Sequence, residues 1–357
     1  MKLLRRILLA IVIISVLLVS GLGLYAWLRQ DRLTEAVIRK INSSLNTKIS
    51  YSTLDVTIFG DFPNITIRLN DLLVSPSQFY DKKQFAGYDN DTLLFASSFS
   101  VSVHLPSLLT GTIAVRSITA HDGEVNLLTD KRGDINFKVL ARESSEGDKS
   151  LKLNNISASR IKTVWYDRKA DIKIIGTINE SNLSGEIFSS GIFLSAILTA
   201  DLNSVDVYGI HSDGGPGRVS VRLRKSENSL SITKGSVDLA GLNFDIDGTI
   251  NFSMKQLDLA INGRKTDLAD LSSLLPDRFR PFARGLGPSG LIDLSCTIKG
   301  QYGETGTPHI EVHYDLSDGR LGSTAIPLRV NDLAFRGTIS NGKNNSPESF
   351  HLKIDTL

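Results

Sequence analysis

From residue 48 onward, apolar and polar residues alternate along much of the chain. The alternation begins with Ile49 and Tyr51, followed by Leu54 and Val56. Successive side chains of a strand point to opposite faces of its sheet, so a period of two predicts strands that each bury one face. The same period returns at residues 65–69, 101–103, 113–115, 156–164, 172–178, 219–223, 237–250, 257–261, 291–298, 310–316 and 328–339. The chain is therefore predicted to be mainly β.

Pairs of Asp, Asn or Arg with Gly separate many of these runs. They are Asp122-Gly123, Arg132-Gly133-Asp134, Asp247-Gly248, Asp318-Gly319 and Asn341-Gly342. Such pairs supply the positive φ angles that tight hairpins require, so we expect short strands with antiparallel neighbours and a turn about every ten residues. After residue 46 one short helix is expected, at 267–275 before Pro276, and 276–290 should not be regular sheet. This organisation disfavours a doubly wound enzyme fold.

The N-terminal region carries a long apolar segment. Residues 7–28 are 22 uncharged residues, which as a helix would span about 33 Å and match a bilayer core. Cations within residues 1–6 and the aromatic pair Tyr25 and Trp27 predict a transmembrane helix with its N-terminus in the cytoplasm. The alternative is a cleaved signal peptide, with small residues at 21–23 as the cleavage site. We favour the retained anchor because the run exceeds the usual apolar core of a signal peptide.

A second helix is predicted directly after the anchor, at 29–47. Its apolar residues recur at helical spacing: Leu33, Val37, Ile38, Ile41 and Leu45. This stripe needs a cover, which could be the start of the β-body or the membrane interface. We favour a helix that caps the β-body.

Composition excludes some classes of function. Of 357 residues, 40 are Lys or Arg and 38 are Asp or Glu, so the net charge of +2 gives no basic field for nucleic acid. Cys296 is the single cysteine and can form no intrachain disulfide. Its alternating neighbours indicate an ordinary strand residue.

Several short motifs contain residue types that carry chemistry in other proteins. His309, Glu311 and His313 share one face of a predicted strand, yet no further ligand has diagnostic spacing, so a solvated strand surface is the preferred interpretation. Residues 285–290 read Gly-Leu-Gly-Pro-Ser-Gly, but a dinucleotide site needs a strand before and a helix after, and here that order is reversed. No G-x-S-x-G elbow, H-E-x-x-H, C-x-x-C or P-loop occurs. We expect no enzyme activity, no cofactor and no metal.

An ordered set of segments resembles one protein family. Residues 59–72 look like a strand opening with an apolar-Pro-x-apolar motif, and 101–113 look like a strand, an x-Leu-Leu-x-Gly turn and the next strand. Residues 115–118 and 123–127 follow, and then 130–137, a D-x-x-G-x-x-N-aromatic hairpin. In this order they resemble the AsmA family of membrane-anchored bacterial envelope proteins, related to TamB and chorein-like lipid-transfer proteins. The match is good to about residue 140 and looser to 340.

The resemblance implies an elongated, curved antiparallel sheet, open along one side, whose apolar groove shields lipid between two membranes. The residues expected to line this groove near the membrane are Ile65, Ile67, Leu69, Val101, Val103, Ile113 and Val115. The partners implied are phospholipid or another membrane lipid, the inner membrane, and outer-membrane or other envelope proteins, with no nucleic acid. The chain would be a single-pass protein of the bacterial inner membrane with a periplasmic body.

The expected division is a cytoplasmic N-terminus at 1–6, the anchor at 7–28, the amphipathic helix at 29–47, an AsmA-like β region at 48–140, a polar loop at 141–150 and a continued groove at 151–357. Two departures from the family are an insertion at 75–91 and a strand-like C-terminus, from which we expect that the native chain continues. Two other functions stay open. One is an assembly factor for outer-membrane proteins that acts by strand addition, and the other is a secreted β-sandwich hydrolase, for which no polar cleft was found.

Overall fold

The computed structural model describes residues 47–57, 61–109, 114–138, 151–188, 191–207, 210–239, 242–273, 280–303, 306–322, 329–346 and 349–356. The predicted transmembrane helix, nearly all of the predicted amphipathic helix and the polar loop at 141–150 lie outside these residues. Within them, no helix is both long enough and apolar enough to cross a membrane.

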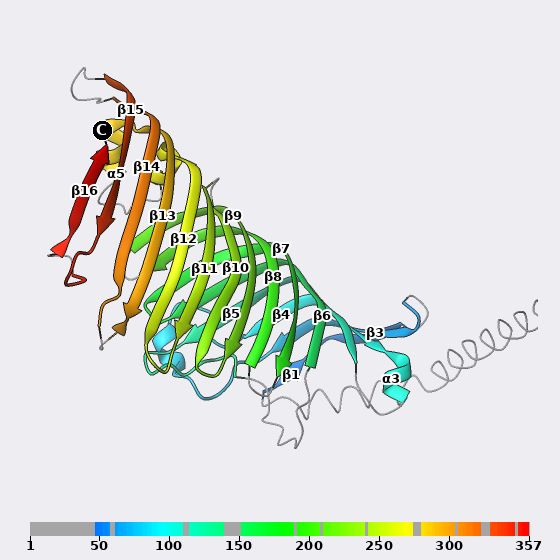
Figure 1. Cartoon of the computed structure of the whole chain (residues 1–357). Coiled ribbons are helices and arrows are strands. Elements are labelled where there is room, and N and C mark those ends of the chain that lie inside the picture. Colours follow the sequence, from blue (N-terminus) through cyan, green and yellow to red (C-terminus); the bar gives the residue numbers. More distant parts are fainter. Residues whose placement is uncertain are drawn as a thin grey trace, which may run out of the picture.

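Sixteen strands form one open, curved sheet (Figure 1). Their bounds are β1 Ile49–Ser50, β2 Thr53–Thr57, β3 Asn64–Val74, β4 Leu94–His104, β5 Val115–Thr129, β6 Leu151–Asp167, β7 Ile172–Phe188, β8 Gly191–Val207, β9 Ile210–Ser226, β10 Ser229–Leu239, β11 Leu242–Asn251, β12 Gln256–Asp267, β13 Ser289–Gln301, β14 His309–Gly322, β15 Arg329–Ser340 and β16 His351–Thr356. The predicted mainly β, open and curved sheet is confirmed.

Strand order follows the sequence. From β3 to β16 each strand pairs with the next one along the chain, while β1 and β2 both pair with β3. All pairs are antiparallel except β5 and β6, which are parallel. Our expectation of antiparallel neighbours throughout is therefore wrong at this point. A two-residue hairpin cannot join parallel strands, and the connection runs through 139–150, outside the described residues.

Many strands are longer than expected, because several glycine pairs lie inside strands. Asp122-Gly123 lies within β5, Asp247-Gly248 within β11 and Asp318-Gly319 within β14. Asp122 and Asp318 have φ of 54° and Gly248 has φ of 138°. A residue inside a strand can take the same positive φ as a residue of a hairpin turn, and Asp318 does so at a β-bulge, so the prediction of turns at these pairs is wrong. Arg132-Gly133 and Asn341-Gly342 do lie in turns.

Four short helical segments accompany the sheet. They are η1 Lys82–Phe85, α3 Leu105–Leu109, α4 Leu268–Ser273 and α5 Arg280–Leu286. The helix predicted at 267–275 is confirmed by α4. The main helix contacts with the sheet are those of α3 with β4, α4 with β12 and β13, and α5 with β14. Most of the sheet thus lacks a helical layer among the described residues.

Candidate functional site

One row of side chains crosses the whole sheet. Residues that face each other in neighbouring strands point to the same side of a sheet, so the strand register defines its two faces. Starting from β2, one row reads Val56, Ile67, Val101, Ile118, Ile156, Leu183, Ala196, Val221, Gly235, Ile246, Ile261, Cys296, Val312, Ile339 and Leu352. No member of this row is charged.

Two further rows run beside it on the same side. One reads Leu54, Leu69, Phe99, Ala120, Ala158, Ser181, Leu198, Val219, Val237, Phe244, Gly263, Leu294, Tyr314, Gly337 and Ile354. The other, from β7 to β14, reads Gly185, Leu194, Leu223, Ile232, Gly248, Leu259, Ile298 and Ile310. We call the side that carries these three rows the apolar face. It is continuous from one end of the sheet to the other.

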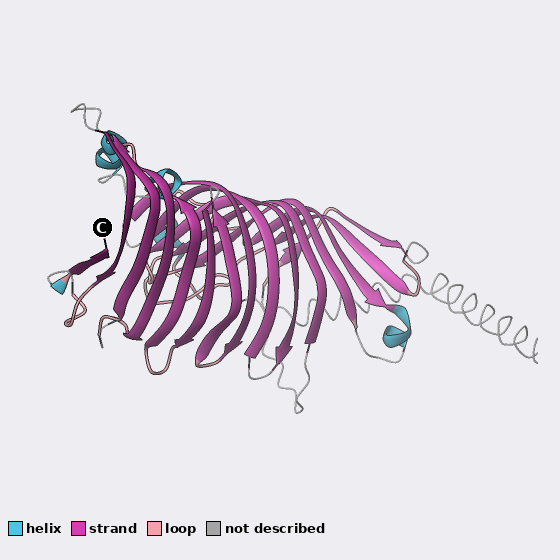
Figure 2. Cartoon of the chain, turned by 45° about the horizontal axis from the view of Figure 1, so that its top comes forward, coloured by secondary structure: helices cyan, strands magenta, loops and turns pink. Residues whose placement is uncertain are grey.

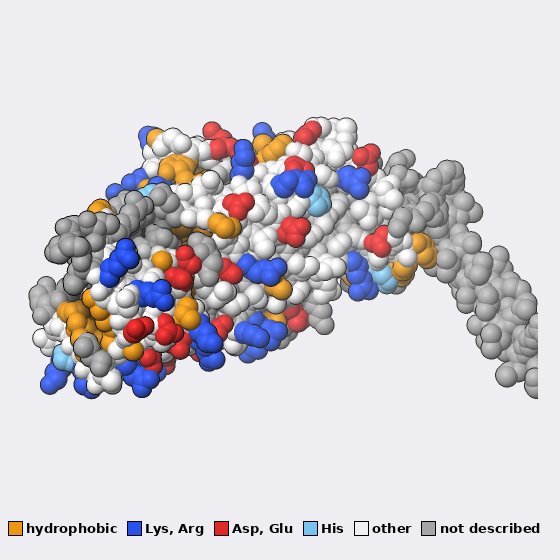
Figure 3. Space-filling model, turned by 90° about the horizontal axis from the view of Figure 1, so that it is seen from above, with side chains coloured by type: hydrophobic (Ala, Val, Ile, Leu, Met, Phe, Trp, Pro, Cys, Tyr) orange, Lys and Arg blue, Asp and Glu red, His pale blue; other side chains and the backbone are white. Residues whose placement is uncertain are grey.

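The opposite face is polar. A row on that side reads Arg68, Ser100, Thr119, Ser157, Asn182, Ile197, Ser220, Ser236, Asp245, Asn262, Ser295, His313, Thr338 and Lys353. Ile197 is its one apolar member, and it is 51 % exposed. The strands arch in Figure 2, and Figure 3 looks onto the convex side, where charged and other polar side chains prevail over the middle of the sheet. The sheet therefore curls around its apolar face.

The apolar face is covered near its two ends. At the β1–β5 end, buried Ile65 and Ile67 pack with Leu105 of α3, and Leu69 belongs to a second buried cluster. At the other end, Leu268 and Leu271 of α4 pack against a cluster of Ile292, Tyr314 and Leu316. These two clusters are ordinary closed core, whereas Leu352 and Ile354 on the last strand, β16, are each 52 % exposed.

The middle of the apolar face is less well covered. Leu183, Val221, Ile246 and Ile261, on strands β7 to β12, are all only half-buried. In β11 the pattern is regular: Phe244 and Ile246 are half-buried, while Asn243, Asp245 and Asp247, which alternate with them, are exposed. No second layer covers this part of the concave face among the described residues. Its half-buried apolar side chains are therefore accessible to a ligand.

The structure places six of the seven predicted groove residues on the apolar face. Ile65, Ile67, Leu69 and Val103 are at most 6 % exposed. Val101 and Val115 are half-buried; Val101 faces Ile67 on β3, and Val115 faces Val103 on β4. Ile113 lies outside the described residues. The predicted set thus belongs mainly to the covered end, whereas the accessible stretch on β7 to β12 was missed because alternation alone does not show what covers a face.

Two glycines let aromatic rings lie low on this face. A Cβ at Gly263 would be 3.0 Å from Cε1 of Phe244, its neighbour on β11. A Cβ at Gly337 would be 2.8 Å from Cζ of Tyr314, its neighbour on β14. Each aromatic ring covers the backbone of the glycine opposite it, and this contact stabilises glycine within a strand. The rings therefore add apolar area without standing up into the space above the sheet.

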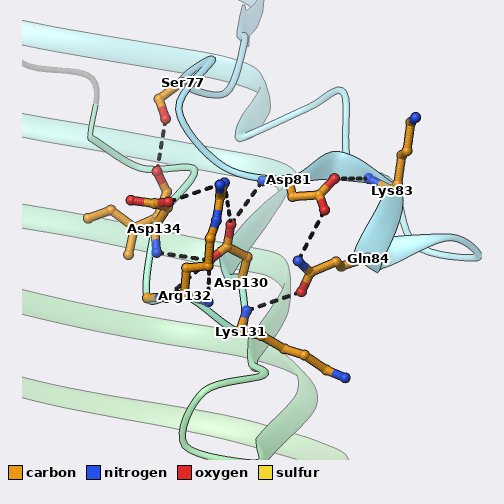
Figure 4. A network of polar contacts seen from close by, with 10 residues as sticks. Ser77, Asp81, Lys83, Gln84, Asp130, Lys131, Arg132 and Asp134 are labelled. Atoms are coloured by element: carbon orange, nitrogen blue, oxygen red, sulfur yellow. Dashed lines mark hydrogen bonds and ion pairs between the residues drawn. The ribbon is translucent and has the colours of Figure 1, made fainter.

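The hairpin at 130–137 is fastened by a buried carboxylate (Figure 4). Oδ1 of Asp130 accepts hydrogen bonds from the backbone N–H groups of Arg132, Gly133 and Asp134 at 2.8, 3.0 and 3.0 Å. Oδ2 accepts from the N–H of Asp81 at 3.1 Å. Burial raises the pKa of the Asp130 carboxyl, but the hydrogen bonds from Asp81, Asp134 and Arg132 outweigh it, and the pKa is lowered overall. The insertion at 75–91 is thereby tied to the hairpin.

Asn136 of the same hairpin binds backbone groups of β5 that lie beyond its pairing with β4. Its Oδ1 accepts from the N–H of Leu128 at 2.9 Å, and its Nδ2 donates to the carbonyl of Asn126 at 2.7 Å. Asn136 is fully buried. The conspicuous residues of this motif are therefore structural, and they hold the covered end of the sheet together.

No family model matches the chain, and no curated protein and no solved structure matches it either.

The polar clusters considered from the sequence lie on the exposed side of the sheet. Nε2 of His313 is 2.9 Å from Oε1 of Glu311, and Nε2 of His309 is 3.8 Å from Oε2 of Glu311. Across the part of the chain that the structure describes, no three His, Cys, Asp or Glu side chains are grouped to hold a metal ion.

Cys296 is half-buried on the apolar face, and burial raises the pKa of its thiol, which disfavours the reactive thiolate.

Proposed function

We propose that this protein is a membrane-anchored protein of the bacterial cell envelope whose apolar face shields the acyl chains of phospholipid or another membrane lipid. The observation that carries the proposal is the continuous apolar face, accessible from β7 to β12. Burial of each acyl CH₂ group against such a face is worth about 0.8 kcal/mol, so one lipid chain gains enough to leave water. No charged side chain interrupts the three rows.

The dimensions of the sheet suit a conduit better than a single binding pocket. Neighbouring strands lie about 4.8 Å apart, so the path from β3 to β16 measures about 60 Å. One leaflet of a bilayer core is only about 15 Å thick, half of the full hydrocarbon core. Several acyl chains could follow one another along this face, which is what passage between two membranes requires.

The location is proposed from the sequence. The apolar segment at 7–28 would anchor the chain in the inner membrane with its N-terminus in the cytoplasm, and the body would lie in the periplasm. The resemblance to the AsmA family supports the same arrangement. Transfer along an apolar surface breaks no covalent bond, so the proposal requires no catalytic residue and no cofactor. A lipid gradient or an external energy source would set its direction.

Val221 and Ser220 provide a matched test, because they are adjacent on β9 and point to opposite faces. We expect Val221→Asp to lower the amount of phospholipid that co-purifies with the full chain. A carboxylate buried beneath an acyl chain costs several kcal/mol. Ser220→Asp adds the same charge to the polar face and should leave the lipid content unchanged. The measurement is lipid mass spectrometry after exchange of detergent for an amphipathic polymer.

Circular dichroism melting of both variants verifies that they are folded. Equal lipid content in wild type, Val221→Asp and Ser220→Asp would count against a lipid-binding apolar face. Lipid bound to the N-terminal segment is common to all three proteins and cancels in the comparison.

A second candidate is assembly of outer-membrane proteins by strand addition. It is favoured by β16, whose six residues are all exposed and which, among the described strands, pairs only with β15. An added strand would continue the ladder through main-chain hydrogen bonds. This function would be favoured if the wild-type protein pulled down unfolded outer-membrane proteins, Ile354→Pro no longer did so, and Val221→Asp still did.

A further inference from the structure

The turn between β11 and β12 exposes two large apolar side chains. Phe252 is 41 % exposed and Met254 is 62 % exposed. The turn lies at one edge of the sheet, directly beyond Ile250 and Leu257, which pair with each other and follow the alternation of the apolar face. The apolar face therefore runs on into this turn.

Hydrogen bonds from three directions hold the turn in place. Oδ1 of Asn251 accepts from the N–H of Met254 at 2.8 Å and from Oγ of Ser253 at 2.9 Å. The N–H of Phe252 donates to the carbonyl of Asn228 at 2.8 Å, and the N–H of Tyr302 donates to the carbonyl of Lys255 at 2.9 Å. The exposed pair is thus presented by a backbone that is fixed to both neighbouring turns. Such pre-organisation lowers the entropy cost of binding.

Other exposed apolar residues continue the line along the same edge. Ile310, at the start of β14, is 37 % exposed, and Phe350, just before β16, is 61 % exposed. The register places them at the same ends of their strands, because Gln256 faces Gln301 and Lys299 faces His309. From β11 to β16 this edge measures about 24 Å. We call Phe252, Met254, Ile310 and Phe350 the apolar edge.

We propose that the apolar edge rests on the surface of a lipid bilayer. Separate apolar side chains spread along one edge suit an extended surface, whereas a protein partner is usually bound through a compact central cluster. Lys255 in the same turn and Lys225 at the nearby end of β9 place cations beside the apolar side chains, a combination typical of segments that lie at a membrane interface. The proposal rests on the proposed lipid shielding and deepens it: lipid would enter the apolar face sideways, across this edge, from a bilayer that lies along β11 to β16 only.

A fluorescent label on Met254 tests this contact. In full-length Cys296→Ser protein held in an amphipathic polymer, Met254→Cys is labelled with an environment-sensitive dye. Protein-free vesicles of phosphatidylethanolamine and phosphatidylglycerol are then added. We expect a blue shift of the emission from position 254. Ile197→Cys, which is on the polar face and also exposed, should show none. An unchanged emission at position 254 would overturn the proposal, and so would equal shifts at both positions.

The double variant Phe252→Ser/Met254→Ser separates this contact from lipid shielding. We expect its vesicle affinity to fall by about tenfold or more, while Ile197→Ser keeps the wild-type affinity. The lipid that co-purifies with the double variant should stay at the wild-type amount, because neither residue belongs to the three rows. Wild-type vesicle affinity in the double variant would contradict the apolar edge alone. Unchanged lipid content in Val221→Asp would contradict lipid shielding alone.

Discussion

Asp130 shows how one buried charge can fasten two segments that are distant in sequence. It is completely buried and receives four backbone hydrogen bonds, three from its own turn and one from Asp81. Gln84 adds a further link, since its Oε1 accepts from the N–H of Lys131 at 3.1 Å. The insertion therefore packs Tyr80 and Phe85 over Leu128 on the polar side of the sheet.

Replacement of Asp130 by Asn should loosen this junction in a pH-dependent way. The folded-state pKa of Asp130 is lowered, so its charge stabilises the fold above the unfolded pKa of about 4 and ceases to do so as the pH falls through the folded value. We expect Asp130→Asn to cost about 1–3 kcal/mol at pH 7, with a smaller difference from wild type at pH 3. Hydrogen exchange of the 77–85 and 130–137 peptides measures this. Asp258→Asn, in an exposed pair with Lys299, should change little at either pH. A pH-independent loss would contradict the role of the charge.

Gly263 should tolerate no side chain while Phe244 keeps its position. We expect Gly263→Val to lower the free energy of unfolding by about 1–3 kcal/mol, because its methyl groups displace the ring. In a Phe244→Ala background the same substitution should cost clearly less. A double-mutant cycle from thermal melting gives the coupling, and strictly additive losses would show that the ring and the glycine do not interact.

At the scale of elements, α4 is the clearest local cover on the apolar face. Its Leu271 packs on a cluster that includes Leu316, which is 2 % exposed. We expect Leu271→Asp to release the helix at a cost of about 1–2 kcal/mol and to raise hydrogen exchange in β13 and β14 but not in β8 and β9. Ala269→Asp, on the exposed side of the same helix, is the control. If hydrogen exchange became faster in β8 and β9 as well, α4 would stabilise the whole sheet and not only β13 and β14.

The strands themselves could be predicted from alternation, because a half-buried strand imposes a period of two on its sequence. Their lengths could not, since Asp122 and Asp318 take inside a strand the same positive φ that a residue takes in a turn. A positive φ also shifts the phase of the alternation: Leu69 and Leu72 lie in one buried cluster although they are three residues apart, with Asp71 at φ of 50° between them. The parallel pairing of β5 with β6 left no local signal at all. The accessible part of the candidate site escaped prediction for a related reason, since exposure depends on long-range packing.

At the scale of the whole molecule, Trp165 can report on the interior of the curve. It faces Leu127 and Ile174 and is 40 % exposed. In a Trp27→Phe variant it is the one remaining tryptophan. We expect brominated phospholipid to quench its fluorescence and bound lipid to protect it from iodide. If iodide quenched Trp165 equally with and without lipid, lipid would not occupy the apolar face beside Trp165.

The neighbour-by-neighbour order of the sheet also has a consequence for how such a chain can change over evolutionary time. From β3 onward each strand depends chiefly on the strands directly before and after it, as repeats do in a solenoid. Gain or loss of one antiparallel hairpin would then change the reach of the molecule by about 10 Å and leave the rest of the sheet in register. Under the proposed function, duplication or deletion of hairpins could match the length of the sheet to the distance between two membranes.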